Sequence, residues 1–372
     1  MKKDQKLTLE EQIEDLKSKN IQFDEESDSA NGLMTINDAQ KFLRYNTFYF
    51  HFKHYAHAFE INKDEREKTG AIKYVNLSFG KMVELSKLDM YFRRIVLHMC
   101  LDVEHLLKTR LIYDITINDK EDGKRIVGKY INTLKNGYKD YVDMKLKHKD
   151  SILAKLVAKF PENQEDLQAW KFVEILSFGQ FIDFYKFYYD EYNERNAHNG
   201  IPTFAKYLDD IRFLRNAAAH NSGLLSDIKS ETEIEPTNNI VNIICDYKKK
   251  QKAINPSVDN GIDNSIDKRR LFEGIDASKQ LSNHVVHDFV TLLFVYRDLL
   301  KHSLDGGMYC RSMEEVDALF NSESGRMVLH KEMFTKDKKL IQSYLFIVDV
   351  LEYIKRCNSS SRKRKKWIIK YN

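Results

Sequence analysis

The sequence predicts an all-α protein, and three observations support this prediction. Glycine and proline contribute only 14 and 4 of the 372 residues, less than half their usual share of about 12%, whereas all-β folds need many such turns. Apolar residues recur at spacings of three and four over long stretches, which is typical of amphipathic helices. Capping sequences precede several of these stretches.

In the first half of the chain, Thr8 and Glu11 have the spacing of a capping box, so a helix should begin at Leu9. A second helix is expected from about Ile36. It leads into residues 42–59, whose aromatic side chains at spacings of three and four we interpret as a core stripe. Further predictions are long helices over 79–112, a helix over 151–160, a buried helix pair over 170–189, and turns at glycines 123, 128 and 137.

In the second half, residues 204–220 are strongly periodic and are closed by Asn221-Ser222-Gly223, a helix stop. Residues 226–270 are polar and predict a loop or insertion. Helices are expected again over 276–302 and 336–355. The predicted organisation is a helical core at 1–225, the polar segment at 226–270, C-terminal helices at 271–357 and a basic tail at 358–372.

Composition excludes several classes of protein. Hydrophobic residues make up 42% of the chain and charged residues 31%, as in a folded globular protein of one large or two ordinary domains. No apolar run approaches the roughly 18 residues of a membrane span, and no apolar segment follows the basic start, so we expect neither a membrane anchor nor a signal peptide. Four scattered cysteines without a CxxC pair favour a reducing cytoplasm.

One segment carries a candidate for chemistry, the pattern R-N-x3-H at residues 215–220. At 100° per residue, Arg215 falls in the middle of the apolar stripe, while Asn216 and His220 share a neighbouring face with Arg212 beside them. An arginine on an apolar face is a local inconsistency of the kind that often marks a functional site. In one interpretation, Arg215 pairs with a buried carboxylate or extends its charged end to solvent, and His220 satisfies the helix C-terminus. In the other, Arg215 stabilises charge while His220 transfers a proton, as cleavage of RNA by its own 2′-OH requires.

The spacing of arginine and histidine does not decide between these interpretations. With 17 arginines and 12 histidines, similar spacings arise by chance. They recur at Arg44…His51, Arg93…His98 and Arg297…His302.

A longer pattern is more specific, because four stretches follow one another in a fixed order. They are residues 7–20 (LTLEEQIEDLKSKN), 42–49 (FLRYNTFY), 170–179 (WKFVEILSFG) and 214–221 (LRNAAAHN). Together they resemble the Abi-like proteins of bacterial abortive phage infection, the AbiD/AbiF type, which belong to the HEPN superfamily of ribonucleases.

The resemblance implies a HEPN-type helical bundle and a ribonuclease site that needs no metal or cofactor. It assigns Arg215 to phosphate stabilisation, Asn216 to positioning and His220 to acid–base catalysis. Such sites form where two motif helices meet, so one motif per chain implies a homodimer through this helix. The alternative is a second motif within the chain, at Arg297 and His302.

Two basic clusters and one motif-helix residue are expected to contact RNA. Consecutive cations beside aromatic rings suit phosphate contact with base stacking. The expected contacts are Arg212, Lys248, Lys249, Lys250, Arg362, Lys363, Arg364, Lys365, Lys366 and Trp367. Some relatives are associated with a small non-coding RNA, which a protein of this kind would hold.

The leading hypothesis is therefore an antiviral endoribonuclease that acts as a toxin during infection. The alternative is a non-catalytic protein that holds a small non-coding RNA, and a third is a helical interaction module. Two histidine groups have spacings that could serve a metal site but lack a clear ligand set. They are His51, His54 and His57, and His98, Asp102 and His105.

Overall fold

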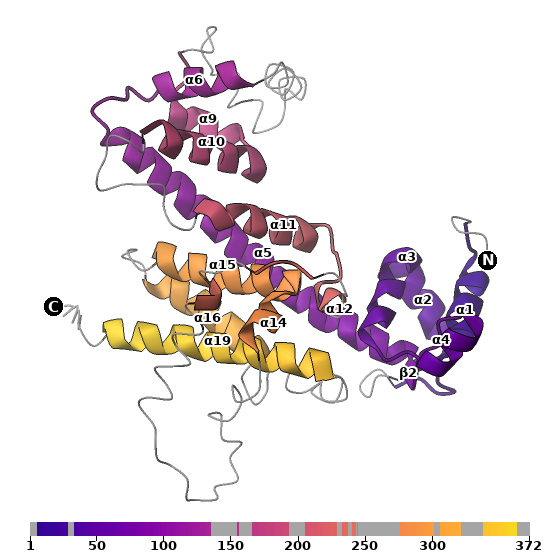
Figure 1. Ribbon diagram of the computed structural model, residues 1–372. Helices are drawn as coiled ribbons and strands as arrows, with labels where there is room; N and C mark the ends of the chain where they lie inside the picture. The colour runs from indigo at the N-terminus through magenta and orange to yellow at the C-terminus, as the bar shows by residue number, and fades with distance from the viewer. Residues whose placement is uncertain are drawn as a thin grey trace, which may run out of the picture. The chain divides into compact units, whose positions relative to one another are not determined.

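The computed structural model describes residues 6–28, 33–134, 155, 166–192, 205–228, 233–236, 240–242, 244, 276–300, 306–320 and 338–362. These residues are almost entirely helical, which confirms the all-α prediction (Figure 1). The strands among them are β1 (Ile21–Gln22) and β2 (Leu77–Ser78), a parallel pair with Ile21 opposite Leu77. In this part of the chain no helix combines the length and the apolar character that a membrane crossing needs.

The chain forms two compact units. The first unit comprises Met1–His98, Leu214–Arg297 and Leu304–Asn372, and the second comprises Met99–Phe213 and Asp298–Ser303. Three helices give residues to both units: α5 (Phe79–Thr116), α11 (Leu208–Ala219) and α15 (His284–Leu300). The boundaries that composition suggested at 225, 270 and 357 remain predictions.

The first unit begins with the predicted capped helices. α1 (Leu9–Ser18) starts at the capping box, where Thr8 Oγ1 accepts the Glu11 N–H at 3.2 Å and the Glu11 carboxylate accepts the Thr8 N–H at 2.6 Å. Thr35 caps α2 (Ile36–Tyr45) in the same way through Asp38 N–H. The chain continues as α3 (Tyr49–Phe52), the 3-10 helix η1 (Lys53–Ala58) and α4 (Lys63–Thr69).

The predicted aromatic stripe is only partly buried. Phe52 and Tyr55 are buried, and Phe52 packs its ring 4.9 Å from that of Phe79. Tyr45 and Phe48, in contrast, are 77% and 67% exposed. Of the stripe residues, Tyr49, Phe52 and Tyr55 are buried, whereas Tyr45 faces solvent because α2 turns Ala39 and Leu43 inward. The interpretation of the stripe as core is therefore wrong for Tyr45.

The core of the first unit lies where the first half of α5 meets the C-terminal helices. Phe92 of α5 packs its ring 4.8 Å from that of Phe289 on α15 and 5.9 Å from that of Phe320. The C-terminal helices are α14 (Ala277–Leu281), α15, α16 (Gly306–Phe320) and α19 (Lys338–Arg362). The helices expected over 276–302 and 336–355 are thus confirmed, whereas α16 was not predicted.

The second unit packs α6 (Arg125–Thr133), α9 (Ala169–Ile175) and α10 (Phe178–Tyr192) together with the second half of α5. α9 and α10 are the buried helix pair that the sequence predicted. Gly123 makes the predicted turn with a φ of +80°, and a Cβ there would lie 2.8 Å from the Trp170 ring. The turn predicted at Gly128 is wrong, because this residue is buried within α6.

Candidate active site

The motif is carried by α11, which the sequence favours for two reasons. Asp209 and Asp210 stand in its first turn, where the helix dipole stabilises negative charge. Its apolar stripe is buried as predicted, with exposures of 0 to 5% at Leu208, Ile211, Leu214 and Ala218. The 3-10 turn η3 (Ala205–Tyr207) precedes it, so the predicted helix is α-helical only from Leu208.

The end of α11 places His220 in the open. Asn221 adopts the left-handed conformation with a φ of 60°. The N–H groups of Asn221 and Ser222 then turn back to the carbonyls of Ala218 and Ala217, at 3.3 and 2.9 Å. This is a Schellman motif, and it leaves His220 as an exposed capping residue at the end of the helix.

Arg215 is half-buried, and most N–H groups of its guanidinium have no acceptor among the described residues. Nη1 donates to Asn216 Oδ1 at 3.2 Å. Nε is buried and has no hydrogen-bond partner among the described residues. No carboxylate of the described residues lies within ion-pair distance of Arg215, so the alternative of a buried ion pair finds no support among them. A partly desolvated guanidinium with unfilled donors matches the oxygens of a phosphate group.

The backbone that follows His220 is fastened to α5. The Leu225 N–H of α12 (Leu224–Asp227) donates to Asp89 Oδ1 at 2.8 Å. The other oxygen of Asp89 accepts the Tyr55 hydroxyl at 2.7 Å and a short hydrogen bond from Arg93. Since α12 begins four residues after His220, this buried network fixes the position from which the histidine is presented.

Two smaller contacts complete the support. A Cβ at Gly223 would lie 2.6 Å from Ser226 Oγ and 3.5 Å from the Tyr55 ring, so the chain needs glycine for this close approach. The amide of Asn283 donates to the carbonyls of Asp227 and Ile228, both at 3.1 Å. The residues of this support were missed in the sequence. Its visible signal was Asp89, an acidic residue in an apolar helix with Arg93 one turn later.

Burial shapes the electrostatics of the network. Asp89 is fully buried, and burial raises the pKa of its carboxyl to about 6, while Arg93 and the Leu225 and Tyr55 hydrogen bonds oppose this rise. Burial likewise raises the pKa of the Tyr55 hydroxyl, and the Asp89 charge adds to the effect. The tyrosine therefore stays a hydrogen-bond donor at neutral pH.

Arg212, predicted to contact RNA, is engaged within the second unit. Its Nη2 lies 3.0 Å from Asp209 Oδ1, and its guanidinium lies 4.8 Å from the centre of the Phe213 ring. A Cβ at Gly179 would come within 3.2 Å of the Arg212 Cδ, which gives the glycine of the WKFVEILSFG stretch a packing reason. RNA contact by Arg212 stays a prediction.

The structure describes only some of the other predicted RNA contacts and only part of the second motif. Arg297 lies with its guanidinium 5.0 Å from the Phe294 ring and 5.9 Å from the Tyr353 ring, and His302 lies outside the described residues. Arg362 ends α19, and its side chain is not described. The remaining predicted contacts lie outside the described residues: Lys248, Lys249, Lys250, Lys363, Arg364, Lys365, Lys366 and Trp367.

These features define a helical protein in which the last turns of α11 carry an arginine hydrogen-bonded to an asparagine, followed by an exposed histidine at the helix end. The profile of the family described as Abi-like protein matches residues 41–226, half of the chain, from α2 to α12. The protein belongs to this Abi-like family, and the family has a role in abortive phage infection. No curated protein and no solved structure matched the chain. The predicted similarity of residues 7–20 lies outside the matched range.

Proposed function

We propose that the protein is a HEPN-type endoribonuclease that cleaves RNA during phage infection and so halts growth. The observation that carries this proposal is Arg215, a half-buried arginine without a carboxylate partner among the described residues, one turn before the exposed His220. A structural arginine in this position would be neutralised, as Arg93 is by Asp89.

The proposed chemistry uses the RNA as its own nucleophile. His220 accepts the proton of a 2′-OH, and the oxygen attacks the adjacent phosphorus. Arg215 stabilises the additional negative charge on the phosphoryl oxygens. The bond from phosphorus to the 5′-oxygen breaks, the leaving oxygen takes up a proton, and the products are a 2′,3′-cyclic phosphate and a 5′-hydroxyl. No step requires a metal or a cofactor.

Asn216 has a positioning role in this scheme. Its side-chain oxygen accepts from Arg215 Nη1, so it restrains the guanidinium. A single His220 cannot easily serve as both base and acid in one step. We therefore propose a homodimer through α11, in which the second copy supplies the second proton-transfer group.

The test is induced expression in a bacterial host with wild type, His220→Ala, Arg215→Ala and a control, His98→Ala. His98 is an exposed histidine on α5, also five residues after an arginine. Wild type and control should arrest growth and leave RNA fragments with 2′,3′-cyclic phosphate ends. Loss of either motif side chain should lower cleavage by about 10²- to 10³-fold.

The proposal fails if the motif variants cleave RNA as wild type does, or if wild type produces no such ends. Circular dichroism of each purified variant separates loss of activity from loss of folding. RNA that copurifies with a protein incapable of cleavage would favour the alternative of an RNA-holding protein. Gel filtration with light scattering tests the homodimer.

A further inference from the structure

The segment from Arg44 to His54 presents an unusual concentration of exposed aromatic rings. Tyr45, Phe48 and Phe50 are 77%, 67% and 47% exposed. Six large aromatic side chains of the described residues are exposed in this way, and three of them lie within residues 45–50. Scattered exposed apolar residues are ordinary, but several exposed rings within one short segment of the chain indicate a surface with a binding role.

Buried neighbours hold this segment in place. Phe52 is fully buried and packs 5.2 Å from the Phe42 ring. Tyr49 is buried, and its hydroxyl donates to Asp15 in a short hydrogen bond. The exposed rings are therefore presented by a packed scaffold, so little conformational freedom remains to be lost when a ligand binds.

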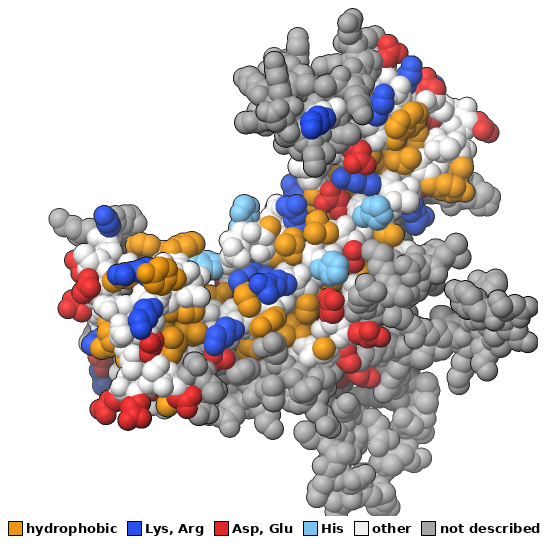
Figure 2. All heavy atoms as spheres, turned by 180° about the vertical axis from the view of Figure 1, so that it is seen from behind, with side chains coloured by type: hydrophobic (Ala, Val, Ile, Leu, Met, Phe, Trp, Pro, Cys, Tyr) orange, Lys and Arg blue, Asp and Glu red, His pale blue; other side chains and the backbone are white. Residues whose placement is uncertain are grey.

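The charges carried by residues 39–59 themselves are of one sign. The Arg44 guanidinium lies 5.9 Å from the Tyr45 ring centre, and the Lys53 ammonium lies 4.6 Å from that of Phe50. Residues 39–59 contain no aspartate or glutamate, although 56 acidic residues in 372 would place about three in a stretch of this length. Figure 2 shows hydrophobic and basic side chains intermingled over the N-terminal helices, on the left of that view, with acidic side chains also present there.

We propose that Tyr45, Phe48 and Phe50, with Arg44 and Lys53, form a binding surface for unpaired RNA. Bases stack on the exposed rings, and the two cations contact the phosphates between them. The absence of acidic residues from positions 39–59 favours a polyanion over a protein partner. Paired RNA keeps its bases within the helix, so stacking selects single-stranded segments.

The surface and the motif belong to the same unit, and one network joins their supports. η1 continues directly from α3, and Tyr55 of η1 donates to Asp89, which also accepts the Leu225 N–H behind the motif. The inference thus rests on the proposed function and deepens it, because it gives the nuclease unpaired RNA as its substrate class.

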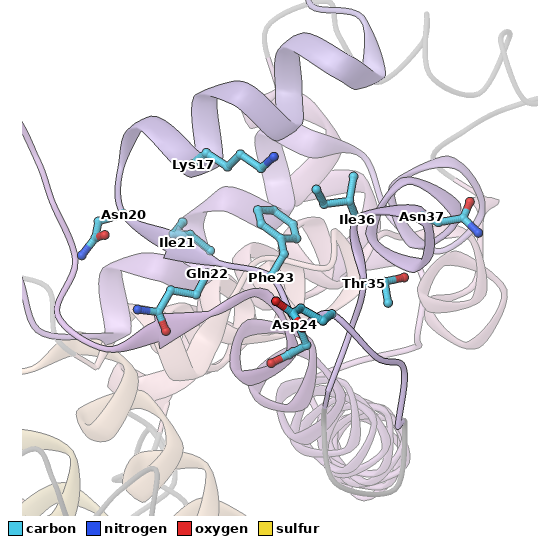
Figure 3. Close-up of a pocket in the computed structure, with 10 residues that line it drawn as sticks. Lys17, Asn20, Ile21, Gln22, Phe23, Asp24, Thr35, Ile36 and Asn37 are labelled. Carbon is cyan, nitrogen blue, oxygen red and sulfur yellow. The ribbon is translucent and has the colours of Figure 1, made fainter.

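A pocket in this part of the molecule gives weaker support for a binding site. Figure 3 shows an open pocket of about 630 Å³, between the loop that follows α1 and the start of α2. Lys17, Phe23 and Ile36 point into it. Lys17 lies 6.0 Å over the Phe23 ring, and the ring stacks on Phe79 at 5.5 Å. The Phe23 ring thus has a ring and a cation of the protein as neighbours.

The test measures binding of a fluorescent single-stranded 12-mer RNA by anisotropy. All proteins carry His220→Ala, so that the RNA stays intact. Tyr45→Ala with Phe48→Ala should weaken binding at least tenfold, while Tyr45→Trp with Phe48→Trp should keep it. The matched control is Tyr113→Ala, which removes a 62% exposed ring from the second unit and should change nothing.

A second pair of variants tests the surface without removing any ring. Arg44→Gln with Lys53→Gln should reduce the slope of log affinity against log salt concentration by about one to two. Unchanged affinity in the ring variants, an equal loss with Tyr113→Ala, or an equal loss for a duplex of the same sequence would overturn the inference.

The experiment also separates this surface from the proposed nuclease. If wild type does not cleave RNA but the ring variants lose RNA binding, the surface stands and the nuclease fails. If wild type cleaves RNA with a KM that the ring substitutions leave unchanged, the nuclease stands and the surface fails.

Discussion

Arg93 and Arg215 each stand five residues before a histidine, and the structure treats them in opposite ways. Arg93 is 8% exposed, and its Nη1 binds both Asp89 and the Tyr55 hydroxyl. Arg215 is half-buried and binds only the side chain of Asn216 among the described residues. The cause of this difference in ion pairing lies four residues before each arginine, where α5 has Asp89 and α11 has Ile211, which cannot form an ion pair.

The two histidines differ as well. His98 lies within the long α5, and its Nδ1 is 3.6 Å from Glu315 Oε2. His220 caps α11, where the helix stops and the side chain meets solvent beside the motif. The same arginine-to-histidine spacing thus accompanies a buried ion pair at Arg93 and, at Arg215, a guanidinium with no carboxylate partner among the described residues.

The largest effect that we expect from this comparison concerns stability. Asp89→Ala should lower the free energy of unfolding by about 3–5 kcal/mol, because it leaves Arg93 buried without its partner. Arg215→Ala should change it by less than about 1 kcal/mol, since alanine favours a helix and no ion pair is lost. Urea unfolding followed by circular dichroism compares the two. Equal losses would make Arg215 a structural residue and break the comparison.

The next effect is a dependence on pH. The folded-state pKa of Asp89, about 6, is above its usual value of 3.8. Between these values the folded protein holds a proton that the unfolded chain has lost, so this contribution is present at low pH. It is lost as pH rises through about 6, and amounts to at most about 3 kcal/mol.

Unfolding of wild type and Asp89→Asn at pH 4.5, 5.5, 6.5 and 7.5 measures this contribution. Because the asparagine does not titrate, the stability of wild type relative to the variant should fall as pH rises across the series. A difference that stays constant would mean that Asp89 is ionised throughout, and that Arg93 outweighs the effect of burial.

The smallest effect belongs to the second histidine. His98 and Glu315 are both about half exposed, and exposed ion pairs contribute little. His98→Ala should therefore change the free energy of unfolding by less than about 0.5 kcal/mol and should leave RNA cleavage intact. A larger loss of stability in thermal unfolding would show that the pair contributes to the packing of α5 against α16. His98→Ala could then no longer serve as a control.

Local signals predicted most of the helices. Thr8 with Glu11 marked the start of α1, and Asn221 marked the end of α11, because capping is decided by residues next to each other in the chain. α16 was not predicted because Gly306 and Gly307 at its start are unfavourable in a helix. The aromatic stripe failed at Tyr45, because α2 turns its Ala39 and Leu43 face inward instead.

The candidate site was predictable in its members but not in its support. The residues of R-N-x3-H lie within six positions, so the sequence alone names them. Asp89 and Leu225 are 136 residues apart and meet through one hydrogen bond at 2.8 Å. No periodicity or capping rule connects them, because their proximity depends on how α5 and α12 pack in the first unit.

The sequence by itself thus determined the helical class, the capped helix ends and the motif residues, because each depends on neighbours within one or two turns. Only the tertiary structure decided that Arg93 is neutralised and Arg215 is not, and that Phe52 is buried while Phe48 is exposed. These outcomes depend on desolvation and on partners distant in the chain, and burial is a property of the packed molecule.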